Sequence, residues 1–183
     1  AITTVDALVA NGATLEVDAS ALTTSNHTLD WNGAAETDGK FSITGGDFGD
    51  TIQGGAQADT INSGSGNDSV TAGNGNNRVD AGTGDNTVAS GTGNDYIVAA
   101  DGNNLISAGT GLNTVLTGSG NDIIETDINS GDDLIHSGAG NDSVYTGNGN
   151  DTIDLGAGND TVIGGMGADD ITLGTGVNRI IYN

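Results

Sequence analysis

An Asp or Asn residue recurs at every ninth position through most of the chain, inside Gly-rich segments that could bind a metal ion. Ten of these positions carry a carboxylate. Carboxylate oxygens and the backbone carbonyls of a Gly-rich turn are hard oxygen ligands, which suit the flexible, oxygen-rich coordination of Ca²⁺. We therefore predict that several calcium ions bind at these carboxylates: Asp50, Asp59, Asp68, Asp95, Asp122, Asp133, Asp142, Asp151, Asp160 and Asp169.

Composition narrows the choice of metal and partner. The chain has no Cys and only two His residues, which argues against zinc and copper. Mg²⁺ fits less well because it demands strict octahedral geometry and keeps its waters. The formal net charge of -22 excludes nucleic acid as a partner, because almost nothing here could neutralise phosphates. No apolar run is long enough to insert into a membrane.

The carboxylates belong to a nonapeptide repeat that begins at residue 45. Fifteen units reach residue 181, and one of them, over residues 126–136, has two extra residues. The unit SGSGNDSVT at residues 63–71 is representative. Position 8 is Ile or Val in all fifteen units, position 6 is Asp or Asn in all fifteen, and Gly fills positions 2 and 4 in thirteen units each. A flexible linker has no reason to keep a β-branched residue in such a register.

This register predicts an all-β solenoid. Positions 7–9 form a very short strand whose middle side chain points inward, where Ile and Val are favoured. The six preceding residues turn the chain, and Gly permits the positive φ angles that such turns need. Two units then make one coil with two strands and two Gly-rich turns. Stacked coils form two parallel sheets with a thin core that needs cations to offset the repulsion between acidic turns.

The units resemble the RTX (repeats-in-toxin) nonapeptide GGxGxDxUx, which binds Ca²⁺. SGSGNDSVT and SGAGNDSVY match every defined position except the first Gly. The resemblance implies a right-handed parallel β-roll with calcium in its turns. It also implies a secreted bacterial protein that leaves the cell unfolded by type I secretion and folds in extracellular calcium.

Some units depart from this pattern. Position 6 is Asn at residues 77, 86, 104, 113 and 178. Asn coordinates through its amide oxygen but brings no charge. We therefore predict tight calcium sites over residues 122–170 and at the start of the array, and weaker or empty sites over residues 77–113. Phe48 and Gln57 stand at position 4 of the first two units, where the motif has Gly. The match of these two opening turns to the calcium-binding motif is therefore in question.

The first 44 residues lack the repeat but alternate apolar and polar side chains. Leu15 and Val17, Leu29 and Trp31, and Phe41 and Ile43 predict three short strands. We divide the chain into a strand-rich lead-in or N-terminal cap over residues 1–44 and a β-roll over residues 45–183.

The sequence favours a calcium-binding structural module over an enzyme, since no arrangement of Ser, His and Asp has a spacing that supports catalysis. The resemblance places such a module in a secreted bacterial cell-surface protein: an adhesin, a surface-layer protein or a filament scaffold. Two alternatives remain open at this point. The chain could be the C-terminal secretion and folding module of a secreted protease, lipase or polysaccharide-modifying enzyme. It could also be a complete subunit that self-associates end to end or side to side.

Overall fold

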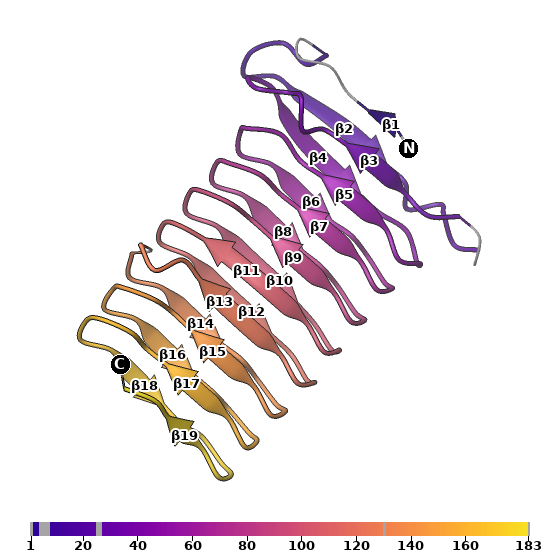
Figure 1. Cartoon of the computed structure of the whole chain (residues 1–183). Helices are drawn as coiled ribbons and strands as arrows, with labels where there is room; N and C mark the ends of the chain where they lie inside the picture. The colour runs from indigo at the N-terminus through magenta and orange to yellow at the C-terminus, as the bar shows by residue number, and fades with distance from the viewer. Residues whose placement is uncertain (1, 4–7, 25–26, 130, 183) are drawn as a thin grey trace.

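The computed structural model describes residues 2–3, 8–24, 27–129 and 131–182 of the chain. These residues form a ladder of flattened coils that advances steadily from the N-terminus to the C-terminus (Figure 1). The described part of the chain contains strands and turns and no helix, so it holds no helix long and apolar enough to cross a membrane. The prediction of an all-β parallel solenoid is confirmed.

Two parallel sheets make up the coils. The first sheet contains the ten odd-numbered strands: β1 (Ile2–Thr3), β3 (Asp30–Asn32), β5 (Thr51–Gln53), β7 (Ser69–Thr71), β9 (Thr87–Ala89), β11 (Leu105–Gly109), β13 (Ile123–Thr126), β15 (Ser143–Tyr145), β17 (Thr161–Ile163) and β19 (Arg179–Ile180). The second contains the nine even-numbered strands: β2 (Thr14–Asp18), β4 (Lys40–Thr44), β6 (Thr60–Asn62), β8 (Arg78–Asp80), β10 (Tyr96–Ala99), β12 (Thr114–Thr117), β14 (Leu134–His136), β16 (Thr152–Asp154) and β18 (Asp170–Thr172).

Within the nonapeptide repeat the register between coils is eighteen residues, as two nonapeptides require. Val70 of β7 lies beside Val88 of β9, and the neighbouring pairs keep the same offset. The eleven-residue unit widens the offset once in each sheet, so that Ile124 of β13 pairs with Val144 of β15. The sheets continue through it, which shows that the two extra residues are absorbed in the turn before β14.

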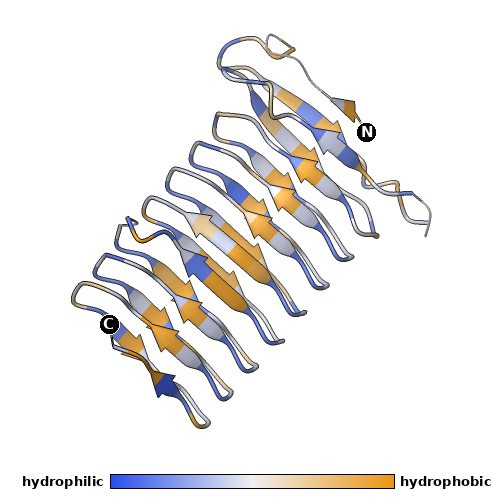
Figure 2. Cartoon of the chain, in the orientation of Figure 1, coloured by the Kyte–Doolittle hydropathy of each residue, from blue (hydrophilic) through white to orange (hydrophobic). Residues whose placement is uncertain are grey.

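The core is the file of position-8 side chains between the two sheets. From Ile52 to Val162 these Ile and Val residues are at most 1% exposed. In Figure 2 the hydrophobic colour accordingly recurs on strand after strand along the ladder. Position 1 adds a second buried column, which the sequence analysis did not anticipate. It includes fully buried Ala72, Ser90 and Leu155.

The first 44 residues supply strands that extend the same two sheets. The three predicted strands are present as β2, β3 and β4. β4 pairs with β6 through Ile43 and Ile61, and β3 pairs with β5 through Trp31 and Ile52. Trp31 packs edge-on against Phe41 with 5.4 Å between ring centroids. This aromatic pair fills the first coils with larger side chains than the Ile and Val residues of the later coils.

A fully buried carboxylate, Glu36, fastens the loop between β3 and β4. Its Oε2 accepts the backbone N–H of Val9 at 3.0 Å, and its Oε1 accepts the N–H of Gly39 at 3.1 Å. This role could not be predicted from the repeat, because Glu36 lies outside it.

Candidate metal centres

The position-6 side chains link consecutive coils on each edge of the roll. In all ten Asp units, Oδ1 accepts a backbone N–H from the preceding coil. Asp68 accepts the N–H of Asp50 at 2.7 Å, and Asp160 accepts that of Asp142 at 2.9 Å. Nine of the ten carboxylates are buried, while Asp169 is half-buried. Each predicted ligand therefore lies in the same structural position, facing into its turn.

The second carboxylate oxygen is the atom that suggests a metal. In six units Oδ2 is buried and has no hydrogen-bond partner in the described part of the chain: Asp68, Asp95, Asp122, Asp142, Asp151 and Asp160. A buried, unpartnered carboxylate oxygen is costly unless a cation or a proton compensates it. Burial raises the pKa of Asp95 to about 6, and it raises the pKa values of Asp68, Asp142 and Asp151 as well.

The Asn units show what surrounds that oxygen. The Nδ2 of Asn77 donates to the carbonyl oxygens of Gly73 at 3.2 Å, Gly75 at 3.1 Å and Ser90 at 3.2 Å. These carbonyls belong to positions 2 and 4 of the same unit and to position 1 of the next coil. Where Asp replaces Asn, the repeat brings a carboxylate oxygen, instead of a donor, toward carbonyl oxygens. Such an oxygen set fits Ca²⁺.

Three other Asn amides also donate to carbonyl oxygens of their own units, at position 4 for Asn86 and Asn104 and at position 1 for Asn178. Asn86 donates to Gly84 at 3.0 Å, Asn104 to Gly102 at 3.0 Å and Asn178 to Leu173 at 2.8 Å. The amide nitrogen thus bonds carbonyl oxygens of its own turn without an ion.

The two opening turns are built differently. The Oδ2 of Asp50 accepts the N–H of Gly46 at 2.7 Å, and the Oδ2 of Asp59 accepts the N–H of Gly55 at 2.8 Å. Both carboxylates are therefore satisfied by backbone donors. Neither Gly46 nor Gly55 has a positive φ, whereas position-2 glycines of most later units do. These are the two units that lack Gly at position 4. The departure from the motif in the sequence therefore coincides with a different turn conformation.

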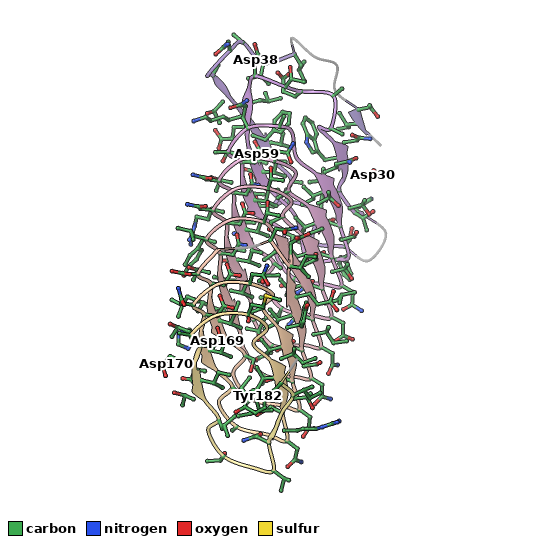
Figure 3. All side chains as sticks on the ribbon, turned by 60° about the vertical axis from the view of Figure 1, so that its left-hand side comes forward. Asp30, Asp38, Asp59, Asp169, Asp170 and Tyr182 are labelled. Atoms are coloured by element: carbon green, nitrogen blue, oxygen red, sulfur yellow. The ribbon has the colours of Figure 1, made fainter. Side chains whose placement is uncertain are left out.

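The eleven-residue unit places its adjacent carboxylates on different sides of the turn. Asp133 is buried, and its Oδ1 accepts the N–H of Asn113 at 2.7 Å. Asp132 is exposed and accepts the N–H of Asn150 at 2.7 Å. The same division occurs near the end of the roll, where Figure 3 shows Asp169 within the outline of the ribbon and Asp170 projecting from it. No three acidic or imidazole side chains converge anywhere in the described ranges. An ion would therefore be held by backbone carbonyls and few carboxylates.

A second, exposed ladder at position 5 was not recognised from the sequence. The Oδ1 of Asn121 accepts the N–H of Asn141 at 2.7 Å, and that of Asn141 accepts the N–H of Asn159 at 2.9 Å. This ladder has the opposite polarity to the position-6 ladder, since each side chain accepts from the following coil. The available signal was Asn at position 5 in eight of the fifteen units.

Comparison with known proteins identifies the repeat. A family model described as the RTX calcium-binding nonapeptide repeat matches residues 44–79, 71–106, 98–129, 127–162 and 146–180. Together these matches cover most of the chain and all of the position-6 carboxylates named above. No curated protein matches the chain.

Proposed function

Because the chain belongs to the family of RTX calcium-binding nonapeptide repeats, we propose that it is a structural module whose coils are held together by several calcium ions. The observation that carries this proposal is the set of six buried Oδ2 atoms without a partner. In each case Ca²⁺ would be bound by a position-6 carboxylate and by carbonyl oxygens of the Gly-rich turns. Bound calcium would supply the positive charge that these turns lack.

The ions would be unevenly distributed. Asp122, Asp142 and Asp160 follow one another on one edge of the roll, and each has an unpartnered oxygen. The turns of Asn77, Asn86, Asn104 and Asn113 hold amide donors instead. We expect the first group to bind calcium most tightly, and we expect the self-satisfied opening turns of Asp50 and Asp59 to bind last.

We further propose that the module works outside a bacterial cell as a scaffold or spacer in a surface protein. Family membership supports the setting. A long, parallel-stacked solenoid supports the role of spacer, because its length grows with each coil.

The test is a titration of Ca²⁺ into EDTA-treated protein, followed by far-ultraviolet circular dichroism and light scattering, with Mg²⁺ as the control ion. We expect a cooperative gain of β structure that Mg²⁺ does not reproduce. A protein that is fully β in EDTA and indifferent to calcium would contradict the proposal. An increase in mass during the same titration would indicate assembly between copies, whereas a constant monomer mass would favour a spacer.

A further inference from the structure

Position 1 of the repeat varies together with position 6. All five Asn units begin with an apolar residue: Ala72, Ala81, Ala99, Ala108 and Leu173. Nine of the ten Asp units begin with Gly, Ser or Thr instead: Gly45, Gly54, Ser63, Ser90, Thr117, Thr126, Ser137, Thr146 and Gly164. Leu155 is the exception.

The two positions are neighbours inside each turn. A Cβ added to Gly45 would lie 2.3 Å from the Oδ2 of Asp50, and one added to Gly164 would lie 2.4 Å from the Oδ2 of Asp169. In the Ser and Thr units the hydroxyl group likewise sits beside the carboxylate of its own unit, as with Ser137. The residue at position 1 therefore forms part of the wall around the candidate ion.

The hydroxyl also has a hydrogen bond that an Ala unit cannot make. Ser63 donates to the carbonyl oxygen of Ala81 at 3.1 Å, and Ser137 donates to that of Leu155 at 3.0 Å. Every Ser or Thr at position 1 donates in this way to the position-1 carbonyl of the next coil. In the Ala72 unit the corresponding carbonyl, that of Ser90, receives its hydrogen bond from the Nδ2 of Asn77.

The hydroxyl at position 1 and the amide of Asn77 are thus alternative donors to the equivalent position-1 carbonyl of the next coil. With Ser or Thr, that carbonyl is held by the hydroxyl, and the position-6 side chain keeps an oxygen free for a cation. In the Ala72 unit no hydroxyl is available, and the Nδ2 of Asn77 supplies the donor, which an Asp carboxylate cannot do. We propose that position 1 is a positioning residue that determines whether a turn binds calcium or closes on its own amide.

This inference rests on the proposed function and makes it specific to single turns. Asn77→Asp alone should bind no additional calcium ion, or bind one about tenfold more weakly than the double variant Ala72→Ser/Asn77→Asp does. The double variant should bind one ion more than the wild type. Both numbers can be measured by calcium titration calorimetry and native mass spectrometry, after circular dichroism in calcium has shown that each variant is folded.

The reciprocal change removes the position-1 hydroxyl of an Asp unit and leaves the carboxylate unaltered. It tests the inference even if the Asn77 variants fail to fold. Ser137→Ala should weaken calcium binding at the Asp142 turn by about tenfold, and Ser137→Thr should restore it. Ser143→Ala, which removes an exposed hydroxyl on the adjacent strand, is the matched control and should have no effect.

The outcomes distinguish a failure of the proposed function from a failure of the role assigned to position 1. A wild-type protein that binds no calcium would overturn the proposed function itself. A wild-type protein that binds calcium, together with an Asn77→Asp variant equal to the double variant or a Ser137→Ala variant equal to the control, would overturn only the role of position 1.

Discussion

At the scale of single residues, Asp and Asn at position 6 have nearly the same shape but opposite hydrogen-bonding requirements. The amide of Asn77 donates to three carbonyl oxygens, whereas the Oδ2 of Asp142 accepts no hydrogen bond from the described residues. A single atom therefore decides whether a turn is stable alone or needs a cation.

Asp142→Asn should have opposite effects in the two conditions. In EDTA it should raise the free energy of unfolding by about 1–3 kcal/mol, because it removes a buried unsatisfied oxygen. In calcium it should remove one bound ion and lower the stability gained from the metal. The folded fraction in EDTA, measured by far-ultraviolet circular dichroism, and urea denaturation in calcium measure the two effects, with Asp170→Asn on an exposed site as the control. A variant less stable than the wild type in EDTA would contradict the prediction.

The pKa of Asp95 predicts how the metal-free protein responds to pH. Burial raises this pKa from 3.8 to about 6, although the N–H of Asn77 and the neighbouring hydroxyl of Ser90 lower it. Between these values the folded state binds more protons than the unfolded state, so stability must fall as the pH rises. In EDTA the protein should be more stable near about pH 4.5 than near about pH 7.5. The folded fraction in EDTA, followed by far-ultraviolet circular dichroism across this window, measures the slope.

Asp95→Asn is the matched variant for the pH prediction, because it removes the titrating group and keeps the shape. Its slope should be smaller than that of the wild type. An equal slope would show that Asp95 does not contribute. In calcium the wild-type slope should flatten or reverse, since protons then compete with the ion.

At the scale of elements, the turns depend on close stacking of backbone. Gly82 has a φ of 63°, and a Cβ at this position would lie 1.6 Å from the carbonyl oxygen of Gly64 in the preceding coil. The preceding coil therefore leaves no room even for a methyl group at this position.

Gly82→Ala should destabilise the protein by about 2 kcal/mol or more, because strain in φ and a backbone clash act together. Gly12→Ala is a suitable control, since Gly12 has a similar φ of 70° but nothing within 4 Å of its added Cβ. Thermal unfolding in saturating calcium compares the two. Equal losses would show that φ strain alone, without stacking, limits these turns.

The sequence predicted the strands better than it predicted the turns. Ile52, Ile61 and their successors recur with a strict period, and a β-branched residue at one inward place is a strong signal. The column at position 1 was missed because Ala, Ser and Thr have no clear preference for burial. The hydrogen bond from the N–H of Gly46 to Asp50 depends on the φ angle of Gly46. Glycine permits several φ angles, so the residue type does not specify this one.

At the scale of the whole molecule, each coil contacts only its two neighbours, so stability is a sum of units and interfaces. The formal net charge of -22 opposes this stacking in the absence of cations. Bound calcium therefore acts on the entire array as well as on single turns, because every ion lowers the repulsion between coils.

The number of ions distinguishes a selective array from a uniform one. Counting the six unpartnered oxygens, plus the similarly placed Asp133 and Asp169, gives an expected range of six to eight calcium ions per chain. Native mass spectrometry or equilibrium dialysis at saturating calcium measures the ratio. Thirteen ions, one for every pair of units two apart, would show that Asn turns bind as well as Asp turns.

The direction of the strands has a mechanical consequence. They run across the long axis of the ladder, so the hydrogen bonds between β7 and β9, and between every later pair, point along that axis. A pulling force on the two ends would load these bonds one coil at a time. Each coil peeled away would release eighteen residues, or about 60 Å of extended chain, in exchange for about 5 Å of folded height. The roll would then lengthen stepwise under tension, and calcium bound in its turns would set the force at which each coil unfolds.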